Sequence, residues 1–123
     1  MPHDRKRFGD WGEEYARRFL EGKGYSIIEA QYRGKYGEID LVALDGDCLV
    51  FVEVKSRRTG AFGRPEESVT MAKQQKLVQS AQEYVQDKGH EGREWRIDVV
   101  GIEAGGLRPR VRLIRNAVMS GEG

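Results

Sequence analysis

Cysteine and histidine, which build most transition-metal sites, are scarce in this sequence of 123 residues. It contains one cysteine, Cys48, and two histidines, His3 and His90. A single cysteine cannot form an internal disulfide or a cysteine-based zinc site, and two histidines in polar surroundings argue against a histidine-rich metal centre. Cys48 has apolar neighbours and is predicted to be a small core residue. Any bound metal ion would therefore be held by carboxylates.

The sequence also lacks an apolar run long enough to cross a membrane. Its longest run is broken by Asp45, Asp47 and Glu53 well before the roughly 18 residues that a span requires, and residues 1–5 lack a signal-peptide segment. Hydrophobic residues make up 38% and charged residues 33%, as in a globular domain. We therefore expect a single domain over residues 1–123, cytoplasmic, with no membrane partner.

An excess of one charge is missing as well. The 21 Lys and Arg nearly balance the 20 Asp and Glu, which gives a net charge of +1 and no global signature of a nucleic-acid-binding protein. Basic residues nevertheless cluster at 5–7, from Lys55 to Arg64, and from Arg108 to Arg115. An argument for nucleic-acid binding must therefore come from the distribution of the basic residues. For the first and last clusters the alternative interpretation is ordinary solvated surface charge.

Apolar periodicity predicts two helices. The spacing of apolar residues from Phe8 to Leu20 is that of one helix face, and Gly22 and Gly24 mark its end. A second helix is predicted over residues 71–88. The segment 56–67, which lies before the second helix, is rich in glycine and arginine and longer than a simple connection needs. It is predicted to be a mobile loop.

Alternating and continuous apolar runs predict five strands. The second and third are joined by Asp45–Asp47 as an antiparallel hairpin, and both of their faces are apolar, which places them at the centre of a sheet. The last strand has alternating arginines, which suits an edge. We expect an α/β fold, a central mixed sheet flanked by helices in the order α-β-β-β-α-β-β. The predicted strands cover residues 25–28, 38–44, 48–55, 95–102 and 110–114.

Two carboxylates end an otherwise apolar face of this hairpin. Asp40 shares a face with Val42, and Glu53 shares one with Phe51. A two-residue turn at Gly46–Asp47 would set Asp40 opposite Glu53, within about 5 Å. Like charges at that separation are unfavourable without a cation.

A third carboxylate is predicted from the first helix. Glu13 lies at the border of its buried face and is predicted to point at the sheet, whereas Glu14 points towards Arg18 as a surface ion-pair partner. Three carboxylates without cysteine or histidine form a site that suits Mg²⁺ or Mn²⁺.

Lys55 stands roughly 7 Å beyond Glu53 on the same face. There it is placed to orient or deprotonate an attacking water and to stabilise charge on a phosphate. The alternative is a salt-bridged polar patch, in which Lys55 neutralises Glu53 and Asp40 at a strand end.

The pattern of Asp40, twelve residues and Glu53–Val54–Lys55 resembles the PD-(D/E)xK signature of restriction-endonuclease-like nucleases, whose core has the same order of elements. A longer match, spanning about residues 9–114, resembles the bacterial YraN family, whose core is similar to archaeal Holliday junction resolvases. Ile39 stands where the signature has proline, as is usual in the resolvase-like branch. The longer match consists of Gly12–Glu13, residues 37–43, residues 49–55 with Arg57, Lys73 with Leu77, and residues 96–100.

The resemblance implies metal binding by Asp40 and Glu53 with support from Glu13, and Lys55 as the catalytic lysine. It implies a Mg²⁺- or Mn²⁺-dependent nuclease that hydrolyses phosphodiester bonds of DNA as a monomer or homodimer, with branched and single-stranded DNA as candidate substrates. Glu38 is predicted to point to the other face and is left outside the site.

Four basic residues are predicted to contact the nucleic acid. Arg57, Arg58 and Arg64 directly follow the catalytic strand. Lys73, on the first turn of the second helix, either touches phosphate or is a solvated helix residue. Asp98 is predicted to be only a charge partner for a neighbouring arginine.

Two further interpretations stand beside the nuclease. One is a nucleic-acid-binding module of the same fold that does not cut, and the other is a structural or interaction protein with an ion-paired strand end. The presence of Asp40, Glu53 and Lys55 together favours the nuclease.

Overall fold

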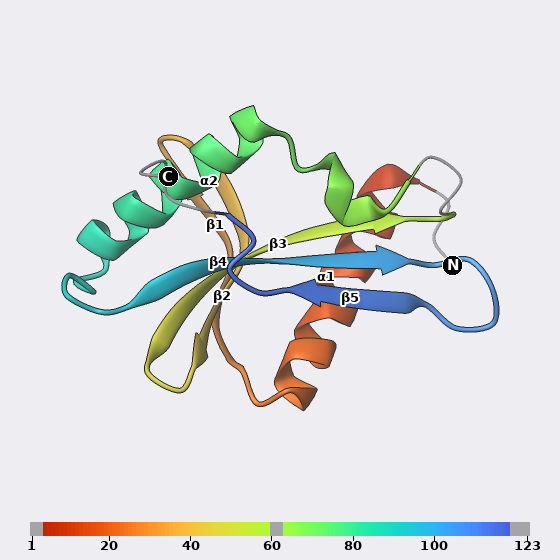
Figure 1. Ribbon diagram of the computed structural model, residues 1–123, viewed down its shortest axis with the longest axis horizontal. Coiled ribbons are helices and arrows are strands. Elements are labelled where there is room, and N and C mark those ends of the chain that lie inside the picture. Colours follow the sequence, from red (N-terminus) through yellow and green to blue (C-terminus); the bar gives the residue numbers. More distant parts are fainter. Residues whose placement is uncertain (1–3, 60–62, 119–123) are drawn as a thin grey trace.

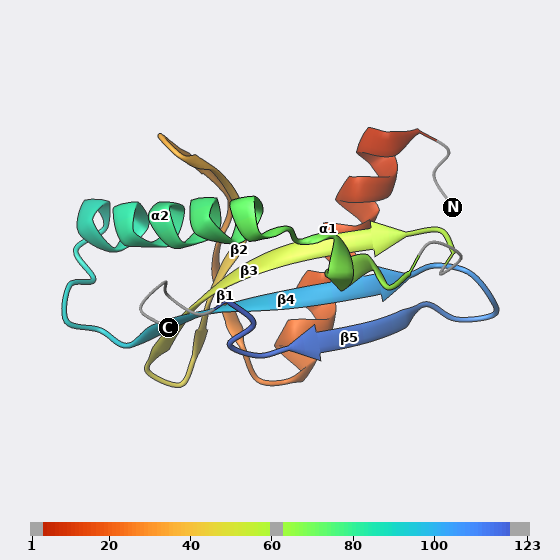
Figure 2. The ribbon, with the colours of Figure 1, turned by 45° about the horizontal axis from the view of Figure 1, so that its top comes forward.

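The computed structural model describes residues 4–59 and 63–118 and consists of a five-stranded sheet with one α-helix on each face (Figures 1 and 2). No helix in this described part has the length and apolarity of a membrane span. The elements in chain order are α1 (Arg5–Gly22), β1 (Ser26–Gly34), β2 (Gly37–Asp45), β3 (Cys48–Arg57), the 3₁₀ helix η1 (Pro65–Ser68), α2 (Met71–Asp87), β4 (Trp95–Glu103) and β5 (Arg110–Ile114).

The predicted order of helices and strands is confirmed, with two corrections. β1 continues to Gly34, well past the predicted end at residue 28. The prediction ended too early because the second half of the strand is polar and lies on a sheet edge, where apolar alternation gives no signal. The predicted loop 56–67 begins as strand and ends as η1, whose start is capped by a hydrogen bond from the Arg64 backbone N–H to Glu67 Oε1 at 2.7 Å. Residues 60–62 of that loop, and His3, lie outside the described residues.

The sheet is mixed, with the strands in the order β1-β2-β3-β4-β5. β3 and β4 are parallel, and the other neighbours are antiparallel. Asp45 pairs with Cys48, so the turn between β2 and β3 has the two residues that were predicted. The central place of these strands and the edge position of β5 are also confirmed.

The two apolar cores lie on opposite faces of the sheet. One core joins Val42 and Phe51 to Leu77 and Tyr84 of α2, and the other joins Leu41, Val50 and Val52 to Ala16 and Leu20 of α1. Cys48 is half-buried at the border of the α1 core rather than inside it. The sheet is thereby covered on both sides, which fixes the strand ends that carry the polar residues.

Asp98 is a fully buried charge that links the ends of several elements. Its Oδ1 accepts hydrogen bonds from Arg96 Nε at 3.0 Å and the Asn116 backbone N–H at 2.9 Å, and its Oδ2 accepts from the Tyr25 hydroxyl at 2.9 Å. Arg96 also bonds Asp45 at 2.9 Å. Asp98 is therefore the charge partner that was predicted, with a structural role.

Replacement Asp98→Asn should lower the free energy of unfolding by about 2–4 kcal/mol. Both carboxylate oxygens accept from donors, so either orientation of the amide would set its NH₂ group against another donor. Urea denaturation measures the loss. The control is Glu91→Gln at an exposed position, where we expect a change below about 0.5 kcal/mol; equal effects of the two variants would contradict the structural role.

Candidate metal and nucleic-acid site

A cleft of about 510 Å³ opens over the ends of β2 and β3, between the first half of α1 and the start of α2. All four predicted catalytic residues line it, and Lys73 lies in its wall. The four are Glu13, Asp40, Glu53 and Lys55. The structure thus brings together residues from α1, β2, β3 and α2 that are up to 60 positions apart in the chain.

Asp40 reaches the cleft because of the hairpin register. The last ladder pair joins Leu41 to Val52; Asp40 and Glu53 come next on the two strands, and their carboxylates are neighbours. The Val54 backbone N–H donates to Asp40 Oδ2 at 2.8 Å. Burial, together with the neighbouring Glu53 carboxylate, raises the pKa of Asp40 to about 8. Among the described residues, Asp40 has no ion-pair partner.

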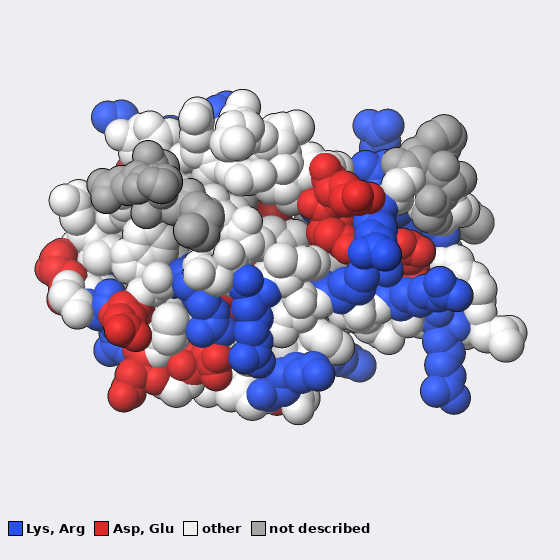
Figure 3. Space-filling model, viewed as in Figure 1, with Lys and Arg blue, Asp and Glu red and all other residues white. Residues whose placement is uncertain are grey.

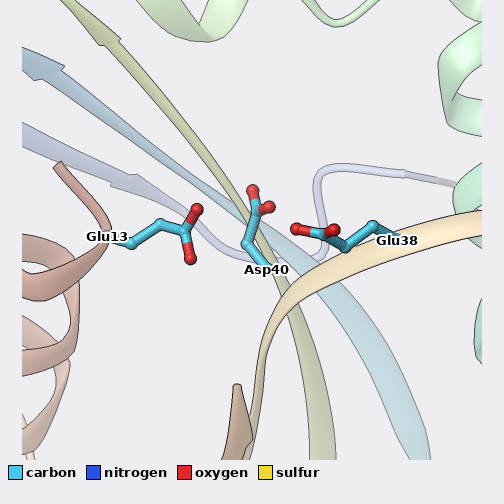
Figure 4. Close-up of side chains that lie close together, drawn as sticks. All are labelled: Glu13, Glu38 and Asp40. Atoms are coloured by element: carbon cyan, nitrogen blue, oxygen red, sulfur yellow. The ribbon is translucent and has the colours of Figure 1, made fainter. Parts of the chain in front are cut away.

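The carboxylates of Glu13, Glu38 and Asp40 each offer an oxygen within 4.8 Å of the others. Figure 4 shows Glu13 and Glu38 pointing towards Asp40 from opposite sides. The prediction for Glu38 was wrong. Glu38 and Asp40 are two residues apart on β2, so strand alternation itself places them on one face.

Glu13 can approach the sheet because the preceding residue is glycine. A Cβ at Gly12 would lie 2.7 Å from Ser56 Oγ and 3.0 Å from Ser56 Cβ, so a side chain there would require Ser56 to shift. Gln31 Nε2 donates to Glu13 Oε1 at 3.3 Å, and burial raises the pKa of Glu13. Glu14 bonds Arg18 on the surface at 3.2 Å, as predicted.

Glu53 is paired with lysines and is only 3% exposed. Its Oε2 lies 2.6 Å from Lys73 Nζ and 3.6 Å from Lys55 Nζ. Glu53 therefore neighbours Asp40 and contacts two ammonium groups. The salt-bridged polar patch predicted the Lys55 contact, whereas neither interpretation predicted the Lys73 contact. Lys73 is half-exposed and bonded to a carboxylate of the cleft, so it is more than a solvated helix residue, and its contact with phosphate stays a prediction.

The pKa values of the two lysines shift in opposite directions. Burial lowers the pKa of Lys55, and the adjacent Lys73 ammonium acts in the same direction. Burial also acts to lower the pKa of Lys73, but its hydrogen bonds to Glu53 and Lys55 and the charges of Glu53 and Asp40 together outweigh burial, and the net shift is upward. Lys55 is thus the lysine that gives up its proton more readily.

The three predicted arginines do not line the cleft. Arg57 is half-exposed at the end of β3, the Arg58 guanidinium lies over the Phe8 ring at 4.4 Å, and Arg64 begins η1. Their contact with nucleic acid stays a prediction.

The C-terminal basic cluster is partly neutralised. Arg112 bonds Glu66 at 2.5 Å and Glu103 at 2.6 Å. Figure 3 shows red and blue side chains side by side over η1, whereas the charged side chains below them, in the lower right part of this face, are mostly blue. Surface ion pairing accounts for Arg112.

Sequence reasoning missed two further residues of the cleft wall, Lys76 and Tyr36. Lys76 is three residues after Lys73, and this spacing on a helix was a signal that both share one face. Tyr36 lies in the turn between β1 and β2, and no sequence pattern connects it with the carboxylates.

The family model that matches residues 12–102 is that of the uncharacterised protein family UPF0102. The chain belongs to this family. It is 49% identical over 113 residues to a UPF0102 protein of Symbiobacterium thermophilum, covering 91% of this chain and 96% of the relative. It is 43% identical over 118 residues to one of Dehalococcoides mccartyi, covering 96% and 98%. The matched region of this UPF0102 chain contains every carboxylate and lysine of the cleft.

Replacement Asp40→Asn should stabilise the metal-free protein, and the gain should grow with pH. The folded-state pKa of about 8 lies above the unfolded value of about 3.9, so between these values the folded protein holds a proton that the unfolded chain has lost. Wild-type stability falls as pH rises through this window, and the asparagine removes that fall. We expect the difference between variant and wild type to grow by at least about 1 kcal/mol from pH 4.5 to 8.

Urea denaturation in chelator at several pH values measures this difference. Glu14→Gln, which removes a carboxylate from the exposed face of α1, is the matched control. An Asp40→Asn variant that is less stable than wild type at every pH would support the salt-bridged polar patch instead.

Proposed function

We propose that the cleft is a divalent-metal-dependent site that hydrolyses phosphodiester bonds of DNA, on a restriction-endonuclease-like core. One observation carries the proposal. Asp40 lies between Glu13 and Glu38, opposite Glu53, and lacks an ion pair among the described residues, while Lys55 stands beside this group. Such a concentration of carboxylates in a cleft is unfavourable for stability and favourable for holding a cation.

The residues fit Mg²⁺ or Mn²⁺ on the chemistry of their donors. Every candidate ligand is a carboxylate oxygen, with no cysteine or histidine in the group. The raised pKa values of Asp40 and Glu13 mark carboxylates that a positive ion would stabilise in their charged form. Asp40, Glu53 and Glu13 would hold the ion, with Glu38 as a further ligand. When bound, it supplies a coordinated water of lowered pKa and neutralises phosphate charge.

The lysines supply the remaining chemistry. Lys55, whose pKa is lowered by burial, is placed to orient a water for attack on phosphorus and to take its proton. Lys73 keeps its positive charge and donates to Glu53 at 2.6 Å. Its place in the cleft wall allows it to exchange this partner for a phosphate oxygen of the substrate.

A second candidate function is a nucleic-acid-binding module of the same fold that does not cut. The observation that favours it is the contact between Lys73 and Glu53, because two lysines already neutralise this carboxylate. In that case the cleft would contact nucleic acid without a metal ion. Its response to cations separates the two candidates.

Manganese should raise the melting temperature of the wild type by mass action, because the folded protein alone holds the carboxylates together. At a concentration 100 times the dissociation constant the gain is about 2.7 kcal/mol. Asp40→Asn should show a much smaller shift, and Glu14→Gln the same shift as the wild type. A wild type indifferent to both manganese and magnesium would leave the binding module as the better candidate.

Cleavage should be found with a panel of single-stranded, linear duplex, flapped and four-way DNA in Mg²⁺ or Mn²⁺. Asp40→Ala and Glu53→Ala should each reduce the rate at least about 100-fold and leave DNA binding largely intact, because these side chains would hold the metal ion while basic residues hold the backbone. Chelator should abolish cleavage, and Glu14→Ala should cut at the wild-type rate. Unchanged cleavage by Asp40→Ala would remove the nuclease assignment.

A further inference from the structure

An exposed aromatic ring stands at the mouth of the cleft. Tyr36 is 38% exposed and is one of four large hydrophobic side chains on the surface of the described residues. It lines the cleft and also a second groove of about 660 Å³. Tyr36 is two residues from Glu38, which limits the distance between their Cα atoms to about 7 Å. Tyr36 and the carboxylates therefore line the same cleft.

The turn that carries Tyr36 is fixed to α2. The Lys35 backbone N–H donates to Glu83 Oε1 at 2.9 Å, and the Tyr32 hydroxyl donates to the same oxygen at 3.4 Å. A Cβ at Gly34 would overlap Glu83 Oε1 at 1.9 Å, so glycine permits this close approach. Figure 2 shows the β1–β2 turn projecting beside α2. The ring is thus held on a rigid support, which lowers the entropy lost when a ligand stacks on it.

The surroundings of the ring are cationic and amide-rich. Lys35 Nζ lies 5.7 Å from the centroid of the Tyr36 ring, and Lys76, exposed in the cleft wall, has no ion-pair partner among the described residues. In the second groove, α2 contributes Gln79, Gln82 and Gln86, which offer both hydrogen-bond donors and acceptors. The two acidic residues of this groove have partners in β1 and the turn: Glu83 accepts from the Lys35 backbone N–H, and Asp87 accepts from the Tyr32 hydroxyl.

An aromatic ring flanked by cations is the platform on which single-stranded nucleic acids bind. Inside a duplex both faces of a base are covered by neighbouring bases, so only an unpaired base can stack on a protein side chain. Stacking on Tyr36 would bring the adjacent phosphate towards Lys76 and the carboxylates.

We propose that Tyr36 stacks on an unpaired base of single-stranded DNA and so selects unpaired DNA as the substrate of the cleft. The inference rests on the proposed function, which it deepens by naming the substrate class. Tyr36 is a specificity-determining residue: it contacts a base, while the carboxylates and lysines act on the phosphate. Lys35 and Lys76 bind the backbone on either side.

Fluorescence anisotropy in chelator tests the stacking without cleavage. The probes are a labelled oligothymidylate, an abasic backbone of equal length and a duplex. Base stacking contributes about 1–3 kcal/mol, so Tyr36→Ala should weaken oligothymidylate binding about 5- to 150-fold. Binding of the abasic probe and of the duplex should not change, because neither offers a free base, and Tyr36→Trp should retain the wild-type affinity for oligothymidylate.

The matched control is Leu107→Ala, another exposed apolar side chain that lies in a separate groove. It should bind all three probes as the wild type does. Unchanged melting temperatures would show that the Tyr36 variants fold. The inference would be overturned if Tyr36→Ala bound oligothymidylate normally, or if it lost affinity equally for oligothymidylate and the abasic probe. A wild type that does not bind oligothymidylate would also overturn it.

Cleavage assays separate this inference from the proposed function. If Tyr36-dependent binding is found but no probe is cut in Mg²⁺ or Mn²⁺, the nuclease assignment fails and the stacking role stands. If single strands are cut at equal rates, at low substrate concentration, by the wild type and Tyr36→Ala, the stacking role fails and the nuclease stands.

Discussion

The register of the β2–β3 hairpin is the constraint on which the cleft depends. Asp45 pairs with Cys48 across a two-residue turn, and every later pair follows from that one, up to the approach of Asp40 to Glu53. Because side chains alternate with a period of two, a slip of β3 by one residue would turn Glu53 and its neighbours to the α1 face. The apolar residues resist such a slip, since those under α2 and those under α1 would have to exchange cores. Two unfavourable charges are thereby held together by packing elsewhere in the sheet.

The two facing carboxylates are not equivalent. Glu53 is almost fully buried and bonded to Lys73, with Lys55 nearby, whereas the neighbours of Asp40 are Glu13 and Glu38. Negative charge therefore accumulates on the Asp40 side, where a proton or a cation has to compensate it. The lysines are on the other side, within reach of a phosphate that approaches the same point. This division, acceptors for a cation next to donors for an anion, is what a metal-dependent phosphodiester hydrolase requires.

The strand part of this arrangement was predictable and the helix part was only partly so. Period-two alternation and the short turn predicted that Asp40 and Glu53 would meet, and the same rule, correctly counted over two residues, also places Glu38 there. The position of Glu13 depends on how α1 packs on the sheet. Its place at the border of the buried face of the helix predicts only that the side chain points towards the sheet, not how close it comes to Asp40. The contact of Lys73 with Glu53 joins α2 to β3 and has no local signal at all. Long-range packing therefore decides which lysines lie beside the carboxylates, and the periodicity of a single sequence does not reveal that packing.

Glycine at two positions sets how closely the walls of the cleft approach. Gly12 lets α1 come so near to β3 that a Cβ would meet Ser56, and Gly34 does the same between the β1–β2 turn and Glu83 of α2. A Cβ at Gly12 would require Ser56 to shift, and a Cβ at Gly34 would displace the Glu83 carboxylate that accepts from the Lys35 backbone N–H. The second displacement would remove a hydrogen bond that ties the turn with Tyr36 to α2. The approach of the elements around the cleft therefore depends in part on residues that have no side chain.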